Sequence, residues 1–157
     1  MEKRGTPFTG ILFAGVMMTQ TGPQVLEFNV RLGDPETQSL LPLIEEDLLP
    51  YFYQASLGKL SEMPPQIRHK KMAAVHVVLA AAGYPGTEGP IQKGDIIHVS
   101  PDLPIGEKLK LYMSGVSKKE SGELVTNGGR VMGLSALAAN RMEARKICYR
   151  EITKISF

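Results

Sequence analysis

The chain has 157 residues, of which 43% are hydrophobic, so it can bury a core as one domain or as two small ones. Its net charge of +2 is too small, and its basic residues too scattered, for a protein that binds nucleic acid. No secretory signal opens the chain and no apolar run nears the roughly 20 residues that span a bilayer, so we expect a cytoplasmic protein without membrane partners.

The first elements that the sequence predicts are two strands joined by a turn. Residues 11–19 are almost continuously apolar and predict a buried strand, and a Gly-Pro pair at 22–23 predicts the turn. The next strand alternates, and its polar face carries Glu27, Asn29 and Arg31. Its opposite face carries four apolar residues, namely Leu26, Phe28, Val30 and Leu32. We therefore expect an antiparallel hairpin whose second arm buries its apolar face and presents a polar row.

This polar row has the composition of a site for a cation and a phosphate. A carboxylate, an amide oxygen and a guanidinium are groups that hold a hard cation beside a phosphate. The strand breaks at Gly33, and Asp34-Pro35 predicts the N-cap and first residue of a helix whose free N–H groups face the end of the row. An ordinary solvated strand face is the alternative, because one such alternating pattern is not specific by itself.

Helices are expected directly after the hairpin. One is predicted over residues 35–44 with a kink or break at Pro42, and a second over residues 45–57, ended by Gly58. The acidic residues 45–47 near the start of the second helix are better explained as compensation of its macrodipole than as metal ligands.

The remainder predicts mainly strands. Residues 58–71, with Pro64-Pro65 and a basic run, mark a domain boundary, which we place between residues 61 and 62. Strands are expected at residues 72–82, 96–99, 108–115, 123–126 and 131–138, and an amphipathic helix at 141–152. The fold class is therefore α+β.

Histidine and cysteine offer few alternative sites. His76 lies within an apolar strand and is expected to be a hydrogen-bonded core histidine, while His69 and His98 lack a partner at metal-ligand spacing. The single cysteine, Cys148, excludes an internal disulfide and a cysteine-built metal site, and we expect it to pack within a helix.

The stretch at residues 27–38 resembles the metal- and substrate-binding strand of ATP-grasp ligases, and more narrowly of phosphoribosylamine–glycine ligases, also called glycinamide ribonucleotide synthetases. The stretch reads Glu27-Phe28-Asn29-Val30-Arg31-Leu32-Gly33-Asp34-Pro35-Glu36-Thr37-Gln38. The resemblance extends through residues 7–19, 83–86, 93–94 and 127–131, in the family's order. The Glu-x-Asn pair indicates only the superfamily, and the continuation from Arg31 narrows it.

The resemblance implies both a fold and a reaction. Residues 1–61 would form the C-terminal part of an ATP-grasp domain, and residues 62–157 a small β-rich, barrel-like C-terminal domain with a helix. The reaction joins glycine to 5-phosphoribosylamine in de novo purine biosynthesis. ATP phosphorylates the glycine carboxylate, the amine attacks this glycyl phosphate, and the products are ADP, phosphate and glycinamide ribonucleotide.

The resemblance also implies roles for five residues. Glu27 and Asn29 would hold Mg²⁺ or Mn²⁺ against the ATP phosphates. Arg31 would contact the nucleotide and substrate phosphates and act catalytically, by stabilising charge on the transferring phosphoryl group or the acyl phosphate. Gly33 and Asp34 would help to position glycine or the amine substrate.

The family's chains are much longer than this one. The resemblance implies that the phosphoribosylamine-binding domain and the first half of the ATP-grasp fold lie outside this sequence, and that relatives continue beyond residues 152–157. Two hypotheses follow: a ligase portion that is active when the missing N-terminal part is present, or a non-catalytic folded fragment or assembly module. A biotinyl-type carrier role is disfavoured, because the sequence has no Met-Lys-Met attachment turn.

Overall fold

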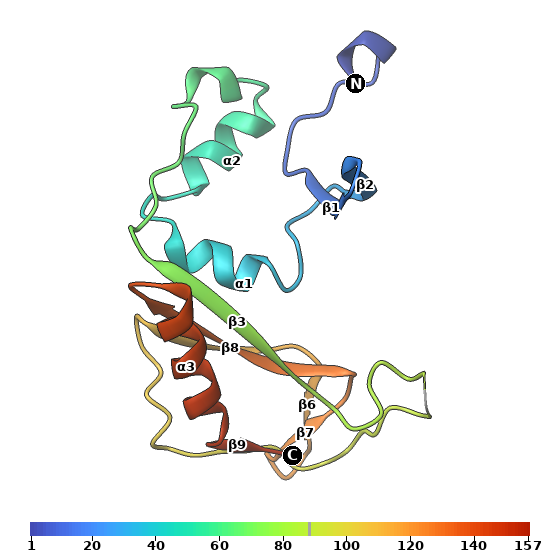
Figure 1. Ribbon diagram of the computed structural model, residues 1–157, viewed down its shortest axis with the longest axis vertical. Coiled ribbons are helices and arrows are strands. Elements are labelled where there is room, and N and C mark those ends of the chain that lie inside the picture. Colours follow the sequence, from blue (N-terminus) through green and yellow to red (C-terminus); the bar gives the residue numbers. More distant parts are fainter. Residues whose placement is uncertain (88) are drawn as a thin grey trace. The chain divides into compact units, whose positions relative to one another are not determined.

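A computed structural model describes residues 1–87 and 89–157, and its packing divides the chain into two compact units (Figure 1). The first unit comprises residues 1–37 and 44–70, and the second comprises residues 38–43 and 71–157. Among the described residues, no helix is both long enough and apolar enough to cross a bilayer. The domain boundary expected between residues 61 and 62 stays a prediction.

The first unit is organised around the expected antiparallel hairpin. After the 3₁₀ turn η1 (Glu2–Arg4), strand β1 (Phe13–Thr19) pairs with strand β2 (Gly22–Asn29). The register shifts between Gly15 and Val16, which face Glu27 and Val25, so Leu26 is an extra residue opposite no partner. Such a β-bulge bends the strand and redirects its side chains. The simple alternation predicted for β2 is therefore interrupted one residue before Glu27.

The burial predicted for the hairpin's apolar side chains is wrong for this structure. Leu26, Phe28 and Val30 are 66%, 63% and 69% exposed, and only Leu32 is half-buried. The continuously apolar strand β1 is likewise largely exposed. The physical reason is that the hairpin is a sheet of only two strands, which leaves too little neighbouring structure to cover it.

The two helices after the hairpin are shorter than the sequence predicts. In place of one helix over residues 35–44, the structure has α1 (Thr37–Leu40) followed by the 3₁₀ turn η2 (Leu41–Leu43). In place of a helix over residues 45–57, it has α2 (Leu49–Ser56), which is followed by the 3₁₀ turn η3 (Leu60–Glu62).

Because of a long-range backbone pairing, α2 begins at a later residue than the sequence predicts. Ile44 forms an antiparallel bridge with His69, which holds the chain extended where the helix was expected. The Asp47 carboxylate then accepts a 2.9 Å hydrogen bond from the Leu49 N–H at the start of the helix. Asp47 therefore acts at a helix N-terminus, in line with the macrodipole prediction, although the helix begins later.

The second unit is built on an open three-stranded antiparallel sheet in the order β3-β8-β5. The strands are β3 (Ala73–Ala80), β8 (Arg130–Ala138) and β5 (Leu109–Met113). Two further pairs are β6 (Val116–Lys118) with β7 (Leu124–Thr126), and β4 (His98–Val99) with β9 (Ile155–Ser156). The fold class is α+β, as predicted. In the part of the chain that the structure describes, β3 and β5 are sheet edges and no pairing closes a barrel.

Helix α3 (Arg141–Ile152) covers one face of this sheet and has the bounds that the sequence predicts. It lies along β3 and β8 (Figure 1). The Asn140 side chain accepts the Glu143 N–H at 3.0 Å, so an N-cap sets its first turn. Cys148 is fully buried among core residues such as Leu134, which confirms its packing role, and burial raises the pKa of its thiol.

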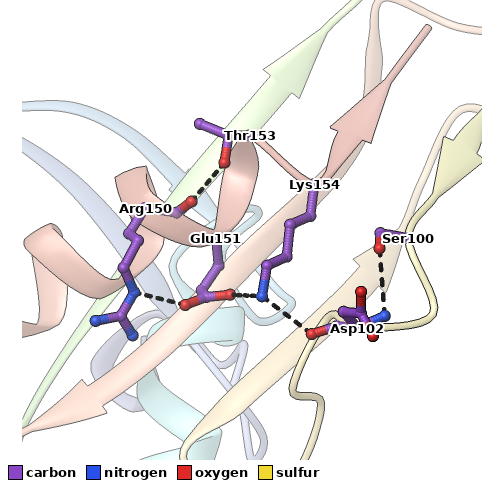
Figure 2. Close-up of polar contacts among 6 residues, drawn as sticks. All are labelled: Ser100, Asp102, Arg150, Glu151, Thr153 and Lys154. Atoms are coloured by element: carbon purple, nitrogen blue, oxygen red, sulfur yellow. Dashed lines mark hydrogen bonds and ion pairs between the residues drawn. The ribbon is translucent and has the colours of Figure 1, made fainter.

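A polar network at the end of α3 ties the helix to a loop (Figure 2). Glu151 is only 3% exposed, and its carboxylate lies 2.9 Å from the Lys154 ammonium and 2.7 Å from the Arg150 guanidinium. The same ammonium donates to the Asp102 carbonyl at 3.0 Å. The Lys154 ammonium, followed by the Arg150 guanidinium, holds the pKa of Glu151 below its ordinary value.

The Glu151→Gln variant should flatten the acid dependence of stability. Because the pKa of Glu151 is lower in the folded chain, its contribution is present above the unfolded pKa and is lost as the pH falls below about 4.5. Denaturant unfolding of the 157-residue chain across pH 3 to 7 measures this. We expect a smaller loss of stability on acidification in Glu151→Gln and an unchanged profile in the exposed control Glu120→Gln. Identical profiles for wild type and Glu151→Gln would contradict the prediction.

Candidate functional site

The predicted polar row lies along β2 and the residues that follow it. Glu27 faces Gly15 across the hairpin. A Cβ placed on Gly15 would lie 3.1 Å from the Glu27 Cγ, tighter than an ordinary contact, so the glycine leaves room for the glutamate side chain. Glu27 is exposed to solvent, with its carboxylate available to a ligand.

A cavity of about 350 Å³ gathers charged groups around Glu27. Its lining residues are Phe13, Gly15, Leu26, Glu27, Arg31, Asp34 and Glu36. Three carboxylates and one guanidinium therefore share one concavity within the first unit. Leu26 lines the same cavity as its neighbour Glu27, whereas strict alternation would place the two on opposite faces; the bulge at Leu26 explains this.

Arg31 and Asn29 are linked to each other. One Arg31 guanidinium nitrogen donates to the Asn29 side-chain oxygen at 3.3 Å, and the other donates to the Leu32 carbonyl at 2.9 Å. The guanidinium is thus held close to the strand end while it lines the cavity. The Asn29 amide nitrogen is buried and makes no hydrogen bond among the described residues, and Asn29 is not among the cavity-lining residues.

Gly33 closes the strand end next to the cavity. It is buried, and a Cβ at this position would lie 2.5 Å from a Glu36 carboxylate oxygen and 2.9 Å from the Phe13 ring. Any larger residue would displace both cavity-lining side chains. Gly33 therefore acts by leaving space, whereas Asp34 itself lines the cavity.

The anion site predicted at a helix start after Asp34 is wrong for this structure. The helix begins at Thr37, and residues 34–36 form a turn. The Thr37 N–H donates to the Gly33 carbonyl at 3.1 Å, and the Thr37 hydroxyl donates to the same oxygen. The Thr37 N–H is therefore used within the chain, and the four-residue helix presents no N-terminal anion site.

The side chains around the cavity suit an oxygen-preferring cation. Carboxylate and amide oxygens are the donors that Mg²⁺ and Mn²⁺ take, and Glu27, Asp34 and Glu36 supply carboxylates. Within the described residues, no three His, Cys, Asp or Glu side chains converge at one metal-binding point.

A larger cavity of about 760 Å³ is also lined by Arg31. Apart from Arg31, its described lining carries no charged side chain and is mostly apolar, with Tyr51 and Phe52 from α2. Nearby, the Arg68 guanidinium lies 2.6 Å from the Glu46 carboxylate, which also accepts a hydrogen bond from the Tyr51 hydroxyl. Arg68, followed by Tyr51, lowers the pKa of Glu46, and the Glu46 carboxylate raises the pKa of Tyr51. This cavity is the larger of the two, whereas the carboxylates of Glu27, Asp34 and Glu36 line the smaller one.

The structure thus brings Glu27, Arg31 and Asp34 around one cavity and places Asn29 and Gly33 beside it. Sequence reasoning assigned no role to Glu36, although its carboxylate lines the same cavity. The alternating pattern ends at Gly33, so strand periodicity carried no signal for Glu36. The available cues were its position two residues after Asp34 and its place within the stretch that resembles the ligase family.

Two family models match the chain. Residues 74–157 match the model described as "Phosphoribosylglycinamide synthetase, C domain". Residues 1–37, which contain the cavity, match the model described as "Phosphoribosylglycinamide synthetase, ATP-grasp (A) domain".

Individual proteins are also similar to this chain over all or nearly all of its length. The phosphoribosylamine–glycine ligase of Caldanaerobacter subterraneus is 44% identical over 100% of this chain and 36% of its own length. The trifunctional purine biosynthetic protein adenosine-3 of Gallus gallus is 41% identical over 100% of this chain and 15% of its own length. A crystal structure of phosphoribosylamine–glycine ligase from Thermotoga maritima covers 99% of this chain with a TM-score of 0.78 and 35% identity, and this chain covers 36% of it. The chain spans about a third of the length of these two ligases.

Proposed function

Because the chain belongs to the phosphoribosylglycinamide synthetase family, we propose that it supplies part of a ligase that joins glycine to 5-phosphoribosylamine with ATP. The observation that carries the proposal is the cavity in which Glu27, Asp34 and Glu36 surround a space shared with Arg31. Carboxylates beside a guanidinium suit a metal–phosphate substrate, because they can hold the cation and the anion together. ADP, phosphate and glycinamide ribonucleotide would be the products.

Glu27 and Asn29 are the proposed metal-holding residues. Their side chains offer the oxygen donors that Mg²⁺ or Mn²⁺ requires, and such an ion supplies charge neutralisation on the ATP phosphates when bound. Glu27 is exposed in the cavity, ready to bind. The Asn29 oxygen accepts from Arg31, so a cation at Asn29 would compete with this hydrogen bond and release a guanidinium donor.

Arg31 is the proposed catalytic residue. Phosphoryl transfer places negative charge on the moving group, and enzymes stabilise it chiefly by positioned cations and donors. The planar guanidinium offers five donors, of which two bind local oxygens. Those that remain can contact the transferring phosphoryl group and the glycyl phosphate.

Gly33 and Asp34 are proposed to position glycine or the amine substrate. Asp34 presents an exposed carboxylate to the cavity, which suits an ammonium or amine group. Gly33 contributes space rather than a contact, since a side chain there would displace Glu36 and Phe13. Glu36 is proposed to position substrate together with Asp34, because its carboxylate lines the same cavity.

Two broader assignments are proposed with the function. Residues 1–61 would belong to an ATP-grasp domain and residues 62–157 to a β-rich C-terminal domain, with the match of residues 1–37 to the ATP-grasp model as support. A cytoplasmic location agrees with purine biosynthesis from soluble metabolites.

The proposal predicts that residues 1–157 turn over substrate only when the preceding part of a ligase is present. In one sample the chain is assayed alone; in another it replaces the matching segment of the Caldanaerobacter ligase. Phosphate release that requires both glycine and phosphoribosylamine is the measurement. We expect release from the chimera and none from the chain alone, because the chain spans about a third of that relative.

The parent Caldanaerobacter ligase is the control. An active parent with an inactive but folded chimera would contradict the ligase proposal. That outcome would instead favour a non-catalytic module, for which the exposed apolar side chains of the hairpin are the supporting observation. Turnover by the chain alone would contradict the need for a preceding segment.

A further inference from the structure

A partly buried chain of hydrogen bonds in the second unit joins β3, β8 and the segment at residues 38–43. The Ser135 hydroxyl donates to the Gln38 carbonyl at 2.6 Å, and its oxygen lies 2.7 Å from Nδ1 of His76. Ser135 is fully buried, at 0% exposure, and faces His76 directly in the register of β8 and β3. The same segment continues into η2, which packs against β3.

The direction of these hydrogen bonds determines which ring nitrogen of His76 carries a proton. A carbonyl oxygen can only accept, so the single hydroxyl proton of Ser135 is used on Gln38. The Ser135 oxygen must then accept from His76, and Nδ1 of the imidazole carries a proton. His76 is therefore the donor that orients Ser135. The hydrogen bond predicted for this histidine is present, although the residue is half-buried and lies outside the core cluster.

The surrounding residues leave a fitted space for the imidazole. A Cβ on Gly133 would lie 2.4 Å from both Cε1 and Nε2 of His76, so only a glycine on β8 admits the ring. The Tyr112 ring on β5 stands edge-on to it, with centroids 6.0 Å apart. Packing on two strands therefore restricts the orientation from which His76 reaches Ser135.

Consecutive residues of the chain carry the two ends of this arrangement. Thr37 is bonded through its N–H and its hydroxyl to Gly33, at the end of the polar row. The next residue, Gln38, is bonded through its carbonyl to Ser135. Two peptide bonds thus separate Glu36, the last residue that lines the cavity, from Gln38, which is held by the sheet of the second unit.

We propose that Ser135 and His76 are positioning residues for the ligase site. They hold the Gln38 carbonyl and so restrain the start of α1. The turn that carries Asp34 and Glu36 leads directly into this helix. Neither touches a substrate; they act through Gln38. The effect on catalysis rests on the proposed function, whereas the restraint itself does not.

The first test measures the restraint without any activity. Hydrogen–deuterium exchange of the 157-residue chain is followed in peptides that cover residues 33–43. Ser135→Ala should exchange there roughly fivefold to tenfold faster, as expected for the loss of one hydrogen bond of ordinary strength. His76→Leu should do the same, and His76→Asn, which keeps a donor near Nδ1, should restore most of the protection.

Thr126→Val is the matched control for Ser135→Ala. Thr126 is 1% exposed in the same unit, and its hydroxyl accepts from the Asp95 N–H at 3.1 Å, away from residues 38–43. The Thr126→Val variant therefore removes a buried hydroxyl from the same unit and should leave hydrogen–deuterium exchange at residues 33–43 unchanged. Equal exchange there in Ser135→Ala and Thr126→Val, or no recovery in His76→Asn relative to His76→Leu, would overturn the proposal.

The second test is kinetic and uses the chimera with the Caldanaerobacter ligase. Ser135→Ala should lower kcat roughly fivefold to tenfold with little change in the KM for ATP, because the site is displaced rather than removed. Ser135→Thr, which keeps the hydroxyl, should recover much of the rate, and Thr126→Val should keep it. An unchanged kcat in Ser135→Ala would overturn the positioning role. An inactive wild-type chimera beside an active parent enzyme would refute the proposed function and with it that catalytic role, while the exchange result still decides the restraint.

Discussion

The Glu27→Gln variant of the chimeric ligase is expected to lose at least about 100-fold in kcat/KM, because losing even an outer partner of a metal ligand costs about 10- to 100-fold. The amide keeps the shape of the side chain but removes the negative charge that would hold Mg²⁺ or Mn²⁺ beside the phosphates. Initial rates at increasing metal concentration measure the effect. We expect excess metal to recover part of the lost rate.

Glu45→Gln is the matched control, since Glu45 is an exposed glutamate of the same unit and does not line the cavity. It should keep the wild-type rate and metal dependence. Wild-type kinetics in Glu27→Gln would remove Glu27 from the metal site. A loss of rate that no metal concentration relieves, with the fold intact, would argue for a role other than metal binding.

The Arg31→Lys variant should lose about 100-fold in kcat although the positive charge is kept, in the range measured when one oriented donor is removed. A lysine ammonium cannot span two phosphate oxygens in the manner of a guanidinium, and it cannot bind Asn29 and Leu32 while also reaching a phosphoryl group. Single-turnover rates at saturating ATP and glycine would place this loss in the chemical steps.

Arg4→Lys makes the same exchange at an exposed arginine of the first unit, outside both cavities. It should have no effect on the rate. A wild-type rate in Arg31→Lys would argue against bidentate contact with a phosphate. A raised KM for ATP with an unchanged kcat would reassign Arg31 to ground-state binding.

Much of the second unit was predictable because its signals are local. Residues 141–152 form a helix with the predicted bounds, since the cap at Asn140 and the helical pattern that follows need no distant partner. The apolar runs that became β3 and β8 were also recognised, because buried strands are continuously apolar. The short strand β9, by contrast, exists only through its pairing with β4.

The helical segments of the first unit were not predictable to the same extent. The bridge between Ile44 and His69 joins residues 25 positions apart in the numbering, and it outweighs a local preference for helix at the start of the predicted second helix. Similarly, Thr37 bonds back to Gly33, so the turn precedes the helix that Asp34-Pro35 was expected to open.

The candidate site divides along the same line. The sequence by itself determined the polar row of Glu27, Asn29 and Arg31, because side chains alternate along any strand, and it also determined the resemblance to a ligase family. Only the tertiary structure showed that Glu36 shares the cavity, and that a bulge at Leu26 places an apolar side chain beside Glu27.

Tertiary structure alone also decided which side chains are buried and which residues hold Gln38, next to the turn that carries Asp34 and Glu36. The apolar side of β2 is exposed because a two-stranded hairpin cannot cover its own faces, whatever its sequence pattern. The link from His76 through Ser135 to Gln38 joins residues that are far apart in the chain, and no local pattern encodes such a contact. Local preferences fix the strands and the last helix, whereas non-local hydrogen bonds determine where the site's residues are held.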